Sequence, residues 1–176
     1  YMVADQRFTA RRPDVIVFKT EPLDSPLTLA GPVNAKLQVS TTGTDADFIV
    51  KLIDVYPDSF PDNEPISCDV RMGGYQQLVR AEIMRAKFRN SFEKPEPLVP
   101  DKITPVNIRL QDVFHTFKSG HRLMVQIQSS WFPLFDRNPQ KFVDIYSAQE
   151  SDFQKATHRI FISGPDASRI NVNIIQ

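Results

Sequence analysis

The stretch VNAKLQVS, residues 33–40, alternates apolar and polar side chains with a period of two. This period is typical of a β-strand that buries one face and leaves the other face polar. The same alternation returns at residues 123–128, where the apolar Leu123, Val125 and Ile127 oppose Met124, Gln126 and Gln128. Each of these two segments is therefore predicted to be a strand with one buried face.

The segment FIVKLI, residues 48–53, is apolar on both faces except for Lys51, which predicts a strand at the centre of a sheet. Fourteen prolines against six glycines interrupt the chain too often for long helices. Between the prolines lie short segments rich in β-branched and aromatic residues, which are predicted as strands at 15–18, 33–40, 48–55, 103–110, 122–130, 157–162 and 170–175. Seven or more short strands predict an all-β fold, a two-sheet sandwich or jelly roll.

Two segments leave the strand pattern in doubt. Residues 76–88, QQLVRAEIMRAKF, contain strong helix formers, but Val79, Ala81 and Ile83 also fit a period of two, and we favour a strand. Residues 110–114 are predicted as a short helical turn before the tight connection at Ser119 and Gly120.

Length and composition predict a single domain spanning residues 1–176. Apolar residues make up 41% and charged residues 24%, and Lys plus Arg equals Asp plus Glu at 21 each, so no excess charge indicates a nucleic-acid partner. No apolar run approaches the length of a membrane span, and no membrane partner is expected. The start, Tyr1-Met2, is unlike a translation start, so we expect that polypeptide precedes it.

A search for catalytic and metal-binding patterns yields none. A Gly-x-Ser-x-Gly nucleophile elbow, a paired-cysteine motif, a His-Glu-x-x-His motif and a calcium loop are all missing from the sequence. We assign structural roles to His115, His121 and His158, and read Cys68 as a packing residue. Catalytic residues, a metal and a cofactor are therefore not expected, and the acids of Asp45-Ala46-Asp47 and of Asp58 with Asp62 are read as solvated loop residues.

The most unusual stretch is SSWFPLFDRNP, residues 129–139, which follows an alternating strand directly. Three aromatic residues, an acid next to a base, and two prolines suggest a rigid loop that presents a surface to a partner. The alternative is structural, with the aromatic side chains covering the sandwich core and Asp136 pairing with Arg137 or a neighbour.

A family resemblance rests on this loop together with GHRLMV, residues 120–125. Further matches are RPDVIVF at 12–18, EPL at 21–23, AGPV at 30–33 and DFIVKLIDVYP at 47–57. These motifs, which span nearly the whole chain, resemble the cocaine esterase and X-prolyl dipeptidyl peptidase group of hydrolases. MVADQRF at 2–8, EIMR at 82–85, SFEKP at 91–95 and VQIQS at 125–129 are most similar to α-amino-acid ester hydrolases and glutaryl-cephalosporin acylase relatives.

The resemblance implies a parent enzyme with an α/β-hydrolase domain, a helical cap and a C-terminal jelly roll similar to galactose-binding domains. The chain then corresponds to the jelly roll, and the catalytic serine, histidine and aspartate belong to the hydrolase domain. By this likeness the jelly roll packs on the hydrolase domain and helps to wall its cleft. The residues expected to make that contact are Trp131, Phe132, Phe135, Asp136, Arg137 and Asn138.

The likeness also implies an exported parent, periplasmic or secreted, that forms homo-oligomers. The single cysteine fits export without disulfides and equally fits the cytoplasm. Two other functions stay open at this point: an autonomous carbohydrate-binding module, because aromatic platforms on jelly rolls stack on sugars, and an independent hydrolase.

Overall fold

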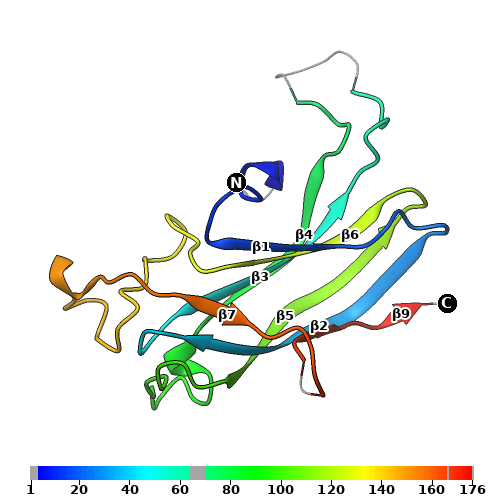
Figure 1. The fold of residues 1–176 in the computed structure, drawn as a ribbon. Coiled ribbons are helices and arrows are strands. Elements are labelled where there is room, and N and C mark those ends of the chain that lie inside the picture. Colours follow the sequence, from blue (N-terminus) through cyan, green and yellow to red (C-terminus); the bar gives the residue numbers. More distant parts are fainter. Residues whose placement is uncertain (1–3, 64–69, 166, 176) are drawn as a thin grey trace.

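The computed structural model describes residues 4–63, 70–165 and 167–175 (Figure 1). Its strands are β1 (Val15–Lys19), β2 (Leu27–Thr41), β3 (Asp47–Val55), β4 (Gln76–Arg85), β5 (Thr104–Phe117), β6 (Arg122–Gln128), β7 (His158–Ile160), β8 (Arg169–Asn171) and β9 (Ile174–Ile175). Three short 3-10 helices accompany them: η1 (Gln6–Phe8), η2 (Ala86–Phe88) and η3 (Glu150–Asp152). No helix within the described ranges has the length and apolar character that a bilayer span requires.

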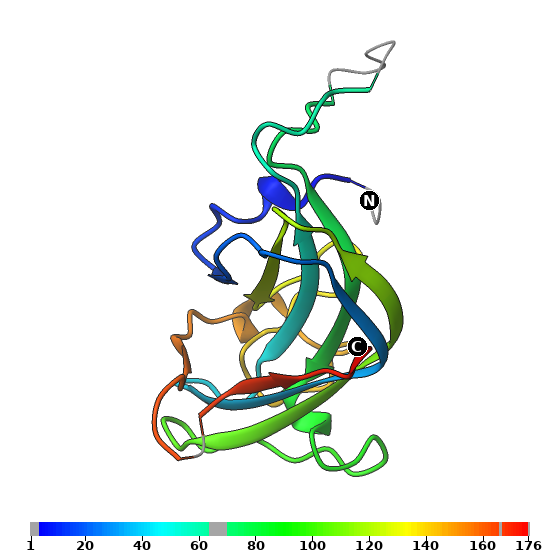
Figure 2. The same ribbon diagram turned by 90° about the vertical axis from the view of Figure 1, so that its right-hand side faces the viewer.

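The strands form two antiparallel sheets that face each other, as Figures 1 and 2 show. The first sheet has the order β1-β6-β3-β4. In the second sheet β2 pairs with β5 along one edge and with β7, β8 and β9 along the other. The predicted jelly-roll β-sandwich is confirmed.

Apolar side chains of both sheets meet in the layer between them. The alternation of β2 is realised as predicted, since Ala35, Leu37 and Val39 are buried and Lys36 is exposed. The other strands contribute their inward-facing residues to the same core: Phe48, Val50 and Leu52 from β3, Val106, Ile108, Leu110, Val113 and Phe117 from β5, and Val125 and Ile127 from β6. The strand period therefore sets which residues fill the core.

Strand β6 corrects one prediction, because it is buried on both faces rather than on one. The outward-facing Gln126 and Gln128 are 0% and 1% exposed. Thr9, next to η1, is also buried, and its hydroxyl donates to Gln126 Oε1 at 2.9 Å. The N-terminal segment thus covers the outer face of the β1-β6-β3-β4 sheet, which local alternation in β6 does not reveal.

The two ambiguous segments are resolved in opposite senses. Residues 76–85 form β4, confirming the strand that we favoured, and only Ala86–Phe88 turn into a 3-10 helix. The helical turn expected at 110–114 is wrong, because β5 runs through it as a strand. Opposite this point β2 has a register shift between Gly31, which pairs with Val113, and Val33, which pairs with Leu110. The irregular composition at 111–112 therefore reflects a bulge in the pairing rather than a helix.

Candidate functional site

The loop of residues 131–153, here called the β6–β7 loop, is fixed at its start by a buried tryptophan. Trp131 is 5% exposed, and its ring stacks on Phe135 with centroids 5.6 Å apart. The Nζ of Lys51, on the central strand β3, lies 5.3 Å from the Trp131 ring centroid. Trp131 is therefore a structural anchor and does not present an open aromatic platform of the kind that stacks on sugars.

Lys51 itself is 0% exposed and donates from Nζ to Gln6 Oε1 at 2.8 Å. Burial and, to a smaller extent, the charge of Arg12 together lower the pKa of its ammonium to about 8. The central strand, the N-terminal segment and the β6–β7 loop consequently meet at one buried cation.

The free energy of unfolding is expected to depend on pH because the ammonium of Lys51 is buried. Below pH 8 Lys51 is protonated in both the folded and the unfolded state, and the folded state carries the full penalty of burying the charge. Between pH 8 and about 10.4 the folded state releases the proton while the unfolded state keeps it, so stability rises with pH, by about 3 kcal/mol over this window. Urea unfolding of the unaltered protein and of Lys51→Met at pH 7 and pH 10.5 measures this gain, which the variant should lack.

Within the β6–β7 loop, residues 136–138 are held by a network around a buried carboxylate. Asp47, 2% exposed, accepts from Arg85 Nε at 2.9 Å and from Asn138 Nδ2 at 2.8 Å. Arg85 also donates to the backbone carbonyl of Asp136 at 3.0 Å. Asp45 is buried beside this network, and burial raises the pKa of its carboxyl. Reading the Asp45–Asp47 acids as solvated loop residues was therefore wrong, because the loop folds over them.

Backbone contacts hold the middle of the β6–β7 loop against the turn after β2. The amide of Thr44 donates to the carbonyl of Gln140 at 3.1 Å, and the Thr44 hydroxyl accepts from the amide of Phe142 at 2.8 Å. A side chain at Gly43 would place its Cβ 2.2 Å from the Gln140 carbonyl oxygen, so glycine is required there. The Nζ of Lys87 adds a bond to the Val143 carbonyl at 2.8 Å.

The remaining predicted site residues point to solvent. Phe132 is 60% exposed and Phe135 is 40% exposed. The Arg137 guanidinium lies 5.7 Å from the Phe132 ring and 5.8 Å from the Phe153 ring. The expected pairing of Asp136 is not seen among the ion pairs of the described residues. Trp131 and Asn138 are therefore buried and structural, whereas Phe132, Phe135, Asp136 and Arg137 are exposed, and their contact with a partner stays a prediction.

Sequence reasoning missed how far this surface extends. Six of the sixteen exposed large apolar side chains on described residues lie in the β6–β7 loop, namely Phe132, Leu134, Phe135, Phe142, Tyr146 and Phe153. Tyr146 is 92% exposed. A cluster of exposed apolar side chains on one loop is typical of a contact surface. The signal was present in the aromatic residues of 142–153, but no short motif marks them.

A second feature that sequence reasoning missed is a buried acid between two histidines. Asp54 is 2% exposed. Its Oδ2 lies 2.9 Å from His115 Nε2, and its Oδ1 lies 2.8 Å from His121 Nδ1. On the described residues, the hydrogen bonds of these two imidazoles lead to Asp54 alone, with no serine attached. The arrangement links β3 to β5 across the sandwich and supports the structural role assigned to His121.

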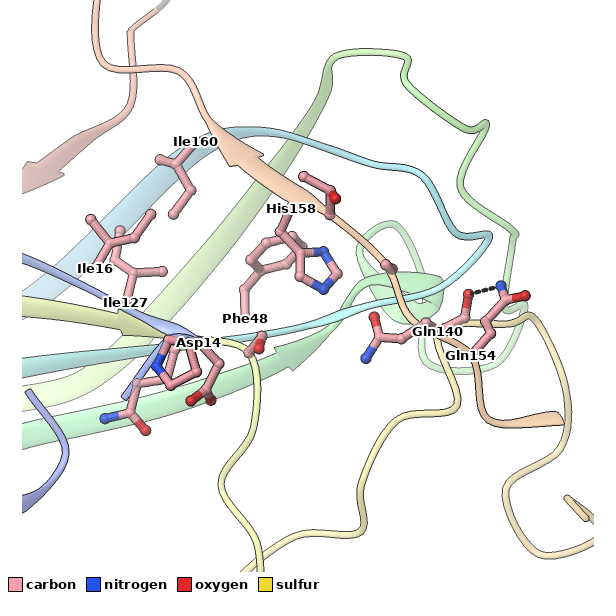
Figure 3. A pocket seen from close by; sticks show the side chains of 13 residues that line it. Asp14, Ile16, Phe48, Ile127, Gln140, Gln154, His158 and Ile160 are labelled. Carbon is pink, nitrogen blue, oxygen red and sulfur yellow. Dashed lines mark hydrogen bonds between the residues drawn. The ribbon is translucent and has the colours of Figure 1, made fainter. Parts of the chain in front are cut away.

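A cavity of about 470 Å³ opens at the edge of the sandwich near β1, β6 and β7. Figure 3 shows Ile16, Ile127 and Ile160 on one side of it and Gln140 and Gln154 on the other. His158 packs edge-on against Phe48 with centroids 5.8 Å apart, and burial lowers the pKa of its imidazole. The cavity thus has an apolar wall and a polar wall, and its lining includes the carboxylate of Asp14.

Comparison with known proteins decides the family. The family model for the X-Pro dipeptidyl-peptidase C-terminal non-catalytic domain matches residues 3–171. The chain belongs to this family. Cocaine esterase from Rhodococcus sp. (strain MB1 Bresler) is 34% identical over 174 residues, which are 98% of this chain and 28% of the esterase.

Solved structures agree with this X-Pro dipeptidyl-peptidase C-terminal assignment. An aminopeptidase from a marine sediment Thaumarchaeota archaeon is 49% identical with a TM-score of 0.92, and an α-amino acid ester hydrolase is 45% identical with a TM-score of 0.91. In both cases the match covers 99% of this chain and 28% of the other chain. The chain therefore spans little more than a quarter of the length of these relatives, and its family is described as non-catalytic.

Proposed function

We propose that this domain packs on the α/β-hydrolase domain of a longer serine hydrolase and helps to shape its active-site cleft. The observation that carries the proposal is that six exposed apolar side chains lie in the β6–β7 loop, two of which, Phe132 and Phe153, lie beside the Arg137 guanidinium. Exposed aromatic residues beside an arginine have the composition of an interface core.

The position of the N-terminal segment also favours a contact on the side of the domain where the β6–β7 loop begins. In a C-terminal domain the catalytic part of the polypeptide precedes residue 1, and Gln6 and Thr9 are tied to the outer face of the β1-β6-β3-β4 sheet through Lys51 and Gln126. The ring of Trp131 lies over the same Lys51. The incoming chain and the start of the β6–β7 loop are thus neighbours, which favours one continuous contact with the preceding domain.

The bond cleaved by the parent is proposed from the relatives, whose names include an esterase, an ester hydrolase and an aminopeptidase. The parent mechanism is then acyl transfer through a serine, an oxyanion hole and a water or amine acceptor. The reading frame that encodes this chain is expected to contain a Gly-x-Ser-x-Gly motif upstream. Export of the parent and its assembly into homo-oligomers stay predictions.

Charge placed on the exposed aromatic residues tests the contact. In the full-length protein, Phe132→Asp and Tyr146→Asp should each weaken domain association by about 2 kcal/mol or more, because a buried interface aromatic is lost and a carboxylate is desolvated. We expect calorimetry to show a separate, earlier unfolding transition and kcat/KM on an ester substrate to fall.

The matched control is Phe114→Asp, because Phe114 is 81% exposed on β5 of the other sheet. This variant should behave like the unaltered protein. If Phe132→Asp and Tyr146→Asp have no larger effect than Phe114→Asp on unfolding and kinetics, the β6–β7 loop is not the interdomain contact.

A further inference from the structure

We infer that the open edge of the sandwich between β1 and β7 is a binding groove for a neutral amphiphile with a hydroxyl-bearing head group and an aliphatic chain. This inference goes beyond the interdomain role and does not depend on it. It concerns the edge of the sandwich and shares with the β6–β7 loop only Gln140, which is not one of the six exposed apolar residues of the proposed interdomain contact.

The groove consists of two adjoining cavities. The first is the 470 Å³ cavity of Figure 3, and the second, of about 250 Å³, shares Ile127 and Ile160 with it as walls. The pairing of Ile16 with Ile127 and of Phe18 with Val125 places the linings of the two cavities at successive inward positions of β1 and β6. The two cavities therefore follow one another along the same edge and form a single groove.

The second cavity supplies an apolar channel. Its walls are mostly aliphatic or aromatic: Phe18, Leu37, Val125, Ile127, Ile160, Ile162 and Ile170. The lining also includes Ser168 and the exposed Arg169. Leu37 and Val125 belong to the main core, so the groove opens onto the interior of the sandwich. An aliphatic chain laid along these walls is removed from water without breaking any hydrogen bond.

The first cavity is polar but carries no uncompensated charge. Its carboxylate, Asp14, accepts from Arg12 Nε at 2.8 Å and forms an ion pair with the same guanidinium. Its imidazole, His158, is held neutral near pH 7 because burial lowers its pKa. A charged head group entering this end would lose its hydration without gaining a counter-charge, so an uncharged head group fits best.

Hydrogen-bonding capacity remains unused at this polar end. On the described residues, three buried side-chain atoms lack a partner, namely Gln128 Oε1, Gln140 Oε1 and His158 Nδ1, and all three residues line the first cavity. All three atoms are covered by protein in this structure, so a bound head group reaches them only when these side chains move. Amide oxygens accept hydrogen bonds, so the head group must donate them, as the hydroxyl groups of a sugar or glycerol do.

An uncharged alkyl sugar tests this groove in the full-length protein. Calorimetric titration with octyl β-D-glucoside, below its micelle-forming concentration, should show saturable binding at one site. Octyl sulfate and octyltrimethylammonium should bind at least about tenfold more weakly, because their charges are not compensated. Glucose alone should also bind more weakly, since it lacks the chain.

Two variants with a matched control locate the site. Ile162→Asp puts a charge into the apolar cavity from a residue that is 63% exposed, and it should weaken binding about tenfold or more. Ile174→Asp, at a residue 55% exposed on β9 outside the groove, should leave affinity unchanged. His158→Phe keeps the ring contact with Phe48 and removes the unpaired Nδ1, so it should weaken binding of the glucoside about fivefold.

The results that overturn the inference are equally definite. Non-saturating binding, equal affinity for the three head groups, or an Ile162→Asp variant that matches Ile174→Asp would each refute it. Absence of binding would also refute it, because the groove is then closed by another segment of the polypeptide, such as an extended strand added to the free edge of β1.

Discussion

The variant Asp54→Ala is expected to lose about 3–5 kcal/mol of its free energy of unfolding, one of the two largest effects expected for this protein. Asp54 is buried and contacts His115 Nε2 at 2.9 Å and His121 Nδ1 at 2.8 Å. Removing the carboxylate leaves two imidazole nitrogens without their partner in the layer between the sheets, and such groups are costly when they stay unpaired. The melting temperature should fall by about 10 °C.

A graded series makes this prediction sharper. Asp54→Asn keeps one acceptor oxygen and the side-chain volume, so its loss should be smaller than that of Asp54→Ala. Asp24→Ala removes an acid that the structure leaves exposed, and it should have no measurable effect. A stability loss for Asp54→Ala no larger than that for Asp24→Ala, measured by urea unfolding, would show that the two histidine contacts do not stabilise the sandwich.

Trp131→Ala is expected to cost a similar amount, about 3–5 kcal/mol of the free energy of unfolding. The ring is 5% exposed, stacks on Phe135 and lies over Lys51, so its removal leaves a cavity beside a buried cation. In the full-length protein the same substitution should weaken domain association, because the β6–β7 loop loses its anchor.

The two effects of Trp131→Ala can be separated. Trp131→Phe retains an aromatic ring, and it should restore most of the domain association while recovering only part of the stability. Kinetics and melting temperature that are unchanged in Trp131→Ala would exclude this loop from both roles. A stability loss with normal kinetics would leave the anchor role intact and contradict the interdomain role.

Prediction of this fold from the sequence succeeded where the hydrophobic period was decisive. The alternation of Ala35, Leu37 and Val39 and the apolar run around Lys51 gave the half-buried and fully buried strands that the structure contains. The strand at 76–85 was recoverable because Val79, Ala81 and Ile83 fit a period of two despite strong helix formers around them. The bulge opposite Gly31 was not recoverable, since a register shift depends on both strands at once.

The candidate site, like the fold, was predictable from the sequence only in part. Motifs in residues 129–139 pointed to the loop, and the structure assigns Trp131 and Asn138 to its anchors and Phe132 to its surface. The burial of Asp47 and the contacts of Asp54 could not be predicted, because their partners lie far away in the sequence, at Arg85, His115 and His121.

The amino-acid sequence by itself determined the all-β class, the residues that face the core, and the family, because side-chain period and ordered motifs are local properties of the chain. Only the tertiary structure decided which face of β6 is covered, which aromatic residues reach solvent, and which acids are buried. These properties depend on contacts between distant segments, whose pairing no local pattern specifies. The open edge between β1 and β7 is of the same kind, since it exists only once the two sheets have been brought together.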